Sequence, residues 1–247
     1  MPLTPAVWER PPYRLEAYFR PNAERQEALK PELAELLHAT FLNHAGYDAE
    51  HLPEFLGSDI FLRVTDEKGL AGIFTADLVR TADQPVLHLT VGLTTPRARS
   101  GGGLMGLCMG LCLDLAAQAF ATEEFYVALR TANPRVVARL WQTPWVRFHP
   151  RGDGEPEPPG LAALRPRFCP QVFGADRCDL AGVIFYDIYP IPPWEGRVPW
   201  HHDPAVNDFC LHHLRPAGRD AFLFLGPTRP PLPGETRGAL AWPLGPR

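Results

Sequence analysis

The sequence predicts an α/β (α+β) protein in which helices flank a mixed, mostly antiparallel sheet. Leucines recur at helical spacing near the N-terminus, and several runs in the middle of the chain alternate apolar and polar residues as strands do. A long apolar segment, 104–121, follows a glycine-rich turn and leads to a further strand-like run. Because two strands joined through a helix run parallel, this order adds a parallel pair to an otherwise antiparallel sheet.

The N-terminal part is predicted to contain an arm and two helices. Residues 1–21 are rich in proline, which indicates an arm. A helix is expected over 23–45, because Asn22 can cap it and leucines recur every three or four residues. Pro31 interrupts this pattern and favours a division of the helix into two pieces. A second, short helix is expected over 49–56.

The rest of the chain alternates strands with helices. Turn residues at 66–69 separate two strand-like runs and predict a hairpin. Pro134 suits a first helical turn, and Asp203 suits a helix cap. The expected strands are 60–65, 70–80, 86–93, 125–131, 181–189 and 221–225, and the expected helices are 103–121, 134–142, 161–168 and 204–214.

Four parts are expected along the chain. An arm at 1–21 precedes a core at 22–150, a C-terminal part at 151–226 completes the sheet, and a tail rich in proline and glycine occupies 227–247. The net charge of −4 argues against a dedicated nucleic-acid binder. No apolar window is long enough to span a membrane and no secretory signal opens the chain, so a cytoplasmic protein is expected.

The stretch from Pro96 to Leu104 predicts an anion site. It contains two arginines and three consecutive glycines between a strand and a helix. Glycines let a backbone approach a phosphate, a helix N-terminus presents unpaired N–H groups, and arginine adds charge-assisted hydrogen bonds. A flexible, solvated turn is the alternative, but three glycines would then cost backbone entropy without a return.

His88 is the candidate base. By alternation it shares a strand face with Thr90 and Gly92. A histidine can take a proton from an ammonium group near neutral pH, directly or through water. The alternative is an exposed or hydrogen-bonded histidine with no chemical role.

Two histidine pairs invite a metal interpretation. His201 and His202 precede Asp203, and His212 and His213 follow on the next expected helix. Adjacent helical residues point in different directions, and Asp203 is an ordinary helix start, so no metal site is expected. The alternative is that these histidines line an acceptor pocket.

The order of elements over 23–142 resembles the GNAT superfamily of acyl-CoA-dependent N-acetyltransferases. The pyrophosphate motif of that family reads Arg/Gln-x-x-Gly-x-Gly/Ala, and here Arg99 supplies its arginine, with Pro96 three residues earlier. Leu104 replaces the last small residue, which lets Gly103 take over the close approach. Asn133, after the next strand, matches the family's asparagine at the pantetheine arm. The tyrosine that protonates the departing thiolate is missing, because Leu140 and Trp141 occupy its neighbourhood.

The resemblance implies an N-acetyltransferase that moves an acetyl group from acetyl-CoA, its co-substrate, to the amine of a small molecule or peptide, with His88 as the catalytic residue. Trp141 would then be a pocket wall, against the alternative of a core aromatic. A homodimer is possible, as in many family members. A non-catalytic acyl-CoA sensor or binding module, and a nucleotide- or metal-binding α/β protein of another type, stay open. The residues assigned to the cofactor are Leu93, Arg97, Arg99, Ser100, Gly101, Gly102, Gly103, Leu104 and Asn133.

Overall fold

The computed structural model describes residues 5–40, 52–82, 84–100, 103–174, 183–188, 200–215 and 218–233. Contacts divide the chain into two compact units. The first unit comprises Met1–Leu78, Leu87–Thr122 and Leu232–Arg247, and the second comprises Val79–Val86 and Glu123–Pro231. The boundary expected at residue 150 falls inside the second unit.

Five strands form the sheet of the first unit. They are neighbours in the order β1 (Ala6–Arg10), β2 (Tyr13–Phe19), β3 (Ile60–Asp66), β4 (Gly69–Thr81) and β5 (Gln84–Thr94). The first three pairings are antiparallel. Two residues join β4 to β5, and so short a connection requires an antiparallel pair. The predicted class of a mixed, mostly antiparallel sheet flanked by helices is confirmed.

The arm expected at 1–21 is replaced by a hairpin. β1 and β2 pair with each other, and β2 continues into the sheet through β3. Trp8 and Leu15 face each other in this pairing and are buried. The residues between the strands are Pro11 and Pro12, so these prolines occupy a turn, where they remove no ladder hydrogen bond.

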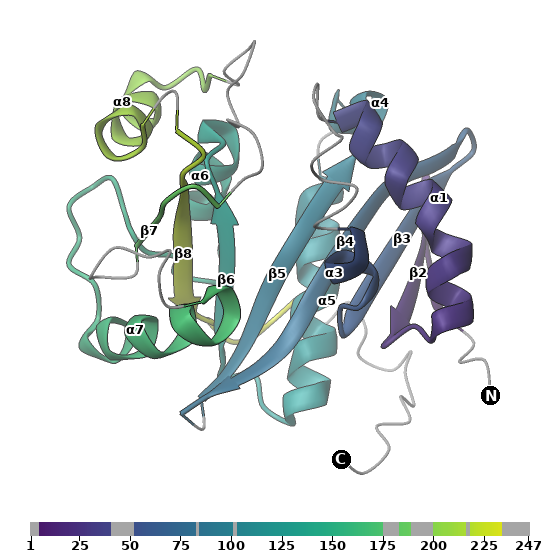
Figure 1. Ribbon diagram of the computed structural model, residues 1–247, viewed down its shortest axis with the longest axis horizontal. Coiled ribbons are helices and arrows are strands. Elements are labelled where there is room, and N and C mark those ends of the chain that lie inside the picture. The colour runs from purple at the N-terminus through teal and green to yellow at the C-terminus, as the bar shows by residue number, and fades with distance from the viewer. Residues whose placement is uncertain are drawn as a thin grey trace. The chain divides into compact units, whose positions relative to one another are not determined.

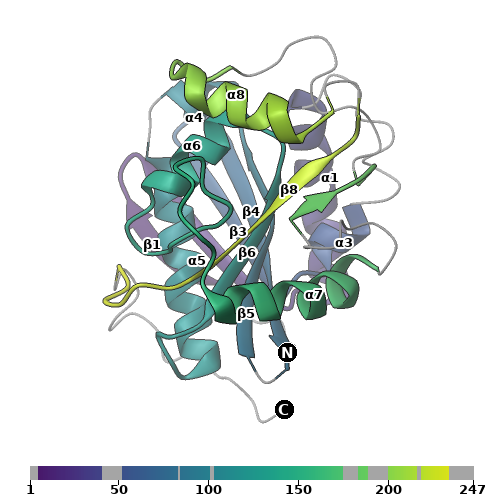
Figure 2. The ribbon, with the colours of Figure 1, turned by 90° about the vertical axis from the view of Figure 1, so that its left-hand side faces the viewer.

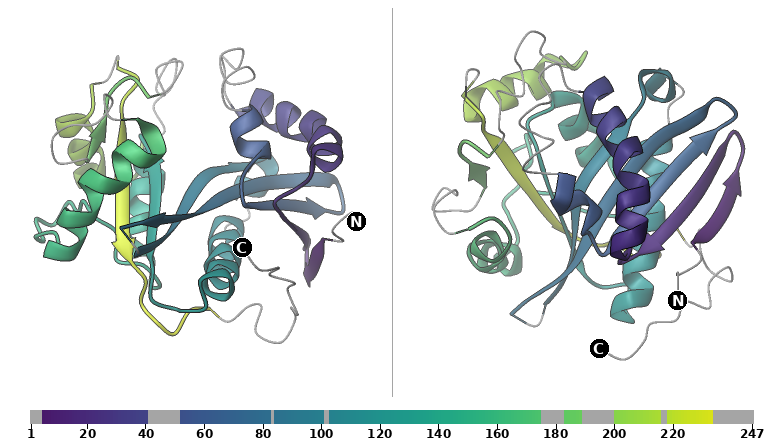
Figure 3. Two further views of the ribbon diagram at one scale, coloured as in Figure 1. Left: turned by 60° about the horizontal axis from the view of Figure 1, so that its bottom comes forward. Right: turned by 45° about the vertical axis from the view of Figure 1, so that its right-hand side comes forward.

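Helices cover both faces of this sheet (Figures 1 and 3). α1 (Ala23–Thr40) and α3 (Leu52–Leu56) lie on one face, and α5 (Leu104–Phe120) lies on the other. α1 continues through Pro31, so its expected division is wrong. Its buried leucines, which lie on both sides of the proline, anchor the whole helix against the sheet, and packing of this kind outweighs one lost hydrogen bond. Expected helical residues 41–45 and 49–51 lie outside the described part.

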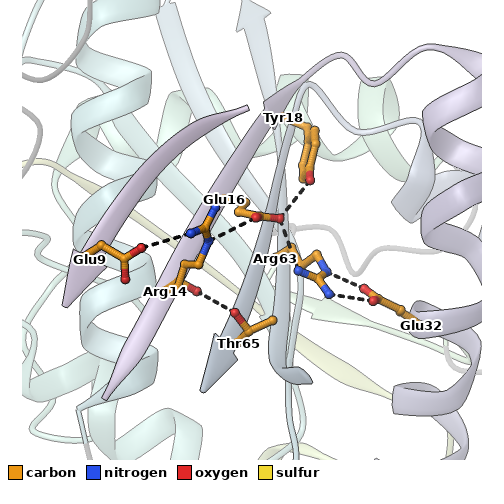
Figure 4. A network of polar contacts seen from close by, with 7 residues as sticks. All are labelled: Glu9, Arg14, Glu16, Tyr18, Glu32, Arg63 and Thr65. Atoms are coloured by element: carbon orange, nitrogen blue, oxygen red, sulfur yellow. Dashed lines mark hydrogen bonds and ion pairs between the residues drawn. The ribbon is translucent and has the colours of Figure 1, made fainter. Parts of the chain in front are cut away.

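A polar network fastens α1 to the sheet (Figure 4). Arg63 on β3 donates two hydrogen bonds of 2.6 and 2.7 Å to Glu32 on α1. It also donates to Glu16 on β2 at 3.2 Å, and Tyr18 donates to the same carboxylate at 2.9 Å. Because the guanidinium donates in fixed directions, these hydrogen bonds fix both the orientation of α1 and its distance from the sheet. An ion pair without such directional hydrogen bonds would fix neither.

The second unit contains three further strands of the sheet, which pair antiparallel with one another. Its strands are neighbours in the order β6 (Tyr126–Thr131), β8 (Ala221–Pro227) and β7 (Ile184–Phe185). The strand expected over 181–189 is thus reduced to two residues, although 181, 182 and 189 lie outside the described part. The chain turns away at Asp187, whose φ is 52° and whose N–H donates to Asp220 instead of to a neighbouring strand.

Three helices accompany this sheet (Figure 2). α6 (Pro134–Gln142) and α8 (Pro204–His213) begin as predicted, α8 with Asp203 accepting a cap hydrogen bond from Ala205. α7 (Pro159–Phe173) is longer than the expected 161–168. Its inner face packs into a core cluster, and the completely buried guanidinium of Arg165 donates to Glu157 and to two main-chain carbonyls. α7 is therefore tied to β8 by both apolar and charged contacts.

Candidate functional site

The connection from β5 to α5 is the predicted anion site. It is not a simple turn, because its first half forms the short helix α4 (Pro96–Ser100). Proline favours the first turn of a helix, and this residue starts α4. Gly101 and Gly102, and the side chains of Arg99 and Ser100, lie outside the described part.

The N-terminus of α5 is open. Its cap residue, Gly103, has φ 91° and supplies no side-chain hydrogen bond, and the first turn holds no acidic residue. A Cβ added at Gly103 or Gly106 would meet no atom within 4 Å. The first amides of a helix lack intrahelical acceptors and carry a partial positive charge. As far as the described residues show, this end of α5 can therefore offer backbone N–H groups to an anion, with no side chain capping them.

Leu93 and Leu104 bracket this connection. Both side chains are buried, at 3% exposure each, so only their main-chain groups could face a ligand. A Cβ at Gly92 would lie 3.1 Å from the Phe74 ring and 3.4 Å from the Met105 methyl. The end of β5 and the start of α5 therefore lie close together, as the prediction requires.

The Arg97 side chain binds residues at the turn between β3 and β4. Its guanidinium binds Asp66, at 3.2 and 2.9 Å, and donates to the carbonyl of Leu70 at 2.7 Å. These hydrogen bonds hold the pKa of the Asp66 carboxyl below its usual value. The structure thus uses Arg97 to clamp α4 onto the turn between β3 and β4, and its role at a phosphate stays a prediction.

His88 lies on β5 in a row of buried polar side chains. Its side chain is 1% exposed, and its Nδ1 lies 3.8 Å from the Asp77 carboxylate on β4. Thr90 shares its face, as alternation predicts, and the Thr90 hydroxyl lies 2.5 Å from that of Thr75 and 3.2 Å from that of Ser58. Because Ser58 follows α3, this row lies on the face that α1 and α3 cover.

Asp77 and Asp59 are not among the site residues predicted from the sequence. Asp77 accepts the N–H of Asp59 at 3.2 Å, and Asp59 accepts the N–H of Leu78 at 2.8 Å. Asp59 also pairs with Arg20 at 2.5 Å. One signal was available for Asp77, since it is the one charged residue in the largely apolar run from Ala71 to Leu78.

The predicted residues of the second unit have structural partners. Asn133 caps α6 and accepts from the N–H of Arg135 at 3.0 Å, so its pantetheine contact stays a prediction. Trp141 donates to the carbonyl of Pro150 at 3.0 Å and packs edge-on against Phe209, as a core aromatic does.

The other chemical candidates have ordinary roles. His201 accepts the N–H of Asp203 at 3.1 Å, and the His213 ring packs tilted against Phe209 and edge-on against Phe222. Among the residues that the structure describes, no group of three histidine, cysteine, aspartate or glutamate side chains could hold a metal ion. Within the same residues, no helix has the length and apolarity of a membrane span.

Comparison with known proteins gives structural neighbours only. No family model matches the chain, and no curated protein is significantly similar in sequence. A GNAT acetyltransferase from Elizabethkingia anophelis with acetyl-CoA bound has a TM-score of 0.43 and 12% identity, over 87% of this chain and 98% of that one. An aminoglycoside 6'-acetyltransferase type Ii has a TM-score of 0.37 and 19% identity, over 48% of this chain and 72% of that one.

An N-acetylglutamate synthase from Neisseria gonorrhoeae, in complex with CoA and N-acetylglutamate, has a TM-score of 0.38 and 10% identity. The match covers 87% of this chain and 35% of the synthase, so the chain spans about a third of that protein. The GNAT acetyltransferases among these structural neighbours are 10–19% identical to the chain at TM-scores of 0.37–0.43, a similarity that assigns the chain no activity.

Proposed function

We propose that the chain binds acetyl-CoA at the connection from β5 to α5 and transfers the acetyl group to an amine. The observation that carries this proposal is the open N-terminus of α5, which begins on Gly103 with no side-chain cap directly after the β5–α4 segment. Two phosphates need several N–H donors and no nearby carboxylate, and the first turn of α5 meets both needs.

The residues present fit the CoA pyrophosphate. Gly103 and Gly106 leave open space where other residues would place a side chain, and Gly103 has a positive φ that side chains disfavour. The main chain near Leu93 would pair with the pantetheine arm. Contributions from Arg99, Ser100, Gly101, Gly102 and Asn133 belong to the proposal and rest on the resemblance.

The proposed reaction is direct attack by the amine. Acetyl-CoA, when bound, supplies the acetyl group as an activated thioester. An attacking amine must first lose the proton of its ammonium form, and the pair formed by Asp77 and His88 is the proposed acceptor. Because His88 is buried, the amine would meet this pair at Asp77. Leu140 and Trp141, in the neighbourhood of the family's tyrosine, carry no phenol to protonate the thiolate, so its departure is expected to be slow.

Calorimetric titration tests the ligand. Acetyl-CoA should bind the wild-type chain more tightly than ATP does. Arg99→Ala should weaken acetyl-CoA binding roughly tenfold or more, since a hydrogen bond to a charged group contributes about 1.5–3 kcal/mol. Lys30→Ala, which removes an exposed charge from α1, is the matched control and should bind as the wild type does. Equal or tighter binding of ATP would favour a nucleotide-binding protein of another type.

A non-catalytic acyl-CoA sensor is the second candidate. The observation in its favour is Trp141, which packs in the neighbourhood of the family's tyrosine and offers no phenol. Release of CoA, measured with and without a panel of amines, separates the two. Amine-dependent turnover supports the enzyme, and slow release with no amine dependence supports the sensor. We also propose that the chain forms a homodimer, which sedimentation equilibrium would test. We propose a cytoplasmic location as well, which cell fractionation would test.

A further inference from the structure

We infer that Asp77 is the binding site for the ammonium group of the acceptor, so that the acceptor is a cationic amine, and that His88 positions this carboxylate from behind. The inference rests on the proposed function, because it names the substrate class of the same site. It concerns residues of the first unit alone.

Asp77 is the solvent-facing member of its polar row. Its side chain is 33% exposed, whereas that of His88 is 1% exposed. Ser58 and Thr75 are equally buried, at 1%, and Thr90 is 8% exposed. A ligand that approaches this face can therefore touch the Asp77 carboxylate, while the hydroxyls and the imidazole lie behind it.

The carboxylate is held in place but not neutralised by a fixed cation. One oxygen accepts the N–H of Asp59, and the other faces His88. Neighbouring Asp59 has its own cation, Arg20. Among the described residues, no arginine or lysine forms an ion pair with Asp77. A half-buried carboxylate of this kind costs free energy unless a cation completes it, and an ammonium group supplies that charge with a hydrogen bond.

Asp77 is far enough from the anion site to act on the other substrate. His88, its neighbour, precedes Leu93 by five residues, which is roughly 16 Å along a strand at about 3.3 Å per residue. The screening length at physiological salt is about 8 Å. Loss of the Asp77 charge should therefore leave the binding of the pyrophosphate almost unchanged.

The proposed transfer conserves both protons and bonds. The ammonium group gives one proton to the Asp77 carboxylate, and His88 lies behind this carboxylate with its Nδ1 3.8 Å away. The neutral nitrogen then forms a bond to the thioester carbonyl carbon, the carbon–sulfur bond breaks, and the second proton of the nitrogen goes to the leaving sulfur. The products are the N-acetyl amine and CoA as its thiol, and one proton leaves through Asp77 to solvent.

Amine binding to the protein saturated with CoA tests the inference without turnover. The probes are putrescine, ethanolamine and glucosamine, with 1,4-butanediol as the uncharged analogue of putrescine. We expect at least one amine to bind the wild type and 1,4-butanediol not to bind. Asp77→Asn should weaken that amine tenfold or more, and Asp77→Glu should restore part of the loss. Glu27→Gln removes a carboxylate that is 74% exposed on α1 and serves as the control.

His88→Gln tests the positioning role through a different readout. It should raise the KM for the amine more than it lowers kcat, with acetyl-CoA affinity unchanged. An equal loss of acetyl-CoA affinity would indicate general packing and overturn this role.

Two results would overturn the assignment of Asp77. One is amine affinity in Asp77→Asn within twofold of the wild type, with circular dichroism showing both folded. The other is a wild type that binds acetyl-CoA but none of the three amines. A wild type that does not bind acetyl-CoA contradicts the proposed function itself, so the two failures are distinguishable.

Discussion

Gly106→Glu should change stability and ligand binding in opposite directions. Gly106 is the third residue of α5, in the first turn, and a Cβ there meets no atom within 4 Å. Replacement of glycine inside a helix gains about 0.5–1 kcal/mol in propensity. A carboxylate in the first turn adds roughly 0.3–1 kcal/mol, because it faces the positive end of the helix. The free energy of unfolding should therefore rise by about 0.8–2 kcal/mol.

The same carboxylate should repel the proposed ligand. Two unit charges about 5 Å apart interact by roughly 1–3 kcal/mol, for effective dielectric constants between 80 and 20. A glutamate at position 106 would thus weaken acetyl-CoA binding by about fivefold to a hundredfold. The loss should shrink as salt is added, because the charges lie at the surface.

Urea unfolding followed by circular dichroism measures the first effect, and calorimetric titration with acetyl-CoA measures the second. Gly106→Gln is the matched control, since it gains helix propensity and similar bulk without the charge. The reasoning is refuted if the Glu and Gln variants bind acetyl-CoA equally well, because the anion site would then lie elsewhere.

Three further changes test the scaffold. Arg165→Met leaves two buried carbonyls and one carboxylate without their donor, so we expect a loss of about 3–5 kcal/mol in urea unfolding; a loss under about 1 kcal/mol would contradict the buried-anchor account. Arg97→Ala should move the midpoint of acid unfolding to higher pH. Arg97 lowers the pKa of Asp66, so it contributes stability that is present above the ordinary pKa of an aspartate and is lost as the pH falls toward the lowered pKa. An unchanged midpoint would count against the clamp. Burial raises the pKa of Cys108 well above its usual value and that of Cys112 to about 12, so peptide mapping should find iodoacetamide on both only after unfolding.

Local sequence signals correctly predicted the helices that begin with a capping residue. Asn133 and Asp203 each accept a hydrogen bond from the helix that they precede, and both helices begin as expected. The same kind of signal misled at the N-terminus, because prolines in a turn between strands resemble prolines in an arm. The strand expected from 181 shortened because Asp187 uses its N–H on Asp220, a contact between segments that are distant in sequence.

The proposed anion end and the proposed acceptor end of the candidate site differ in how far they can be predicted from the sequence. The anion end is one continuous segment, from the end of β5 through α4 to Gly103, so its residue types and spacing are visible in order. The acceptor end gathers Ser58, Asp77 and His88 from three separate segments, and only the pairing of β4 with β5 brings the last two within 3.8 Å. Alternation along one strand could indicate the face of His88 but not its partner, because a partner depends on the register between strands. The residue proposed to meet the acceptor thus depends on register, and a shift of one residue in that pairing would remove Asp77 from His88 while leaving the segment proposed to bind the anion intact.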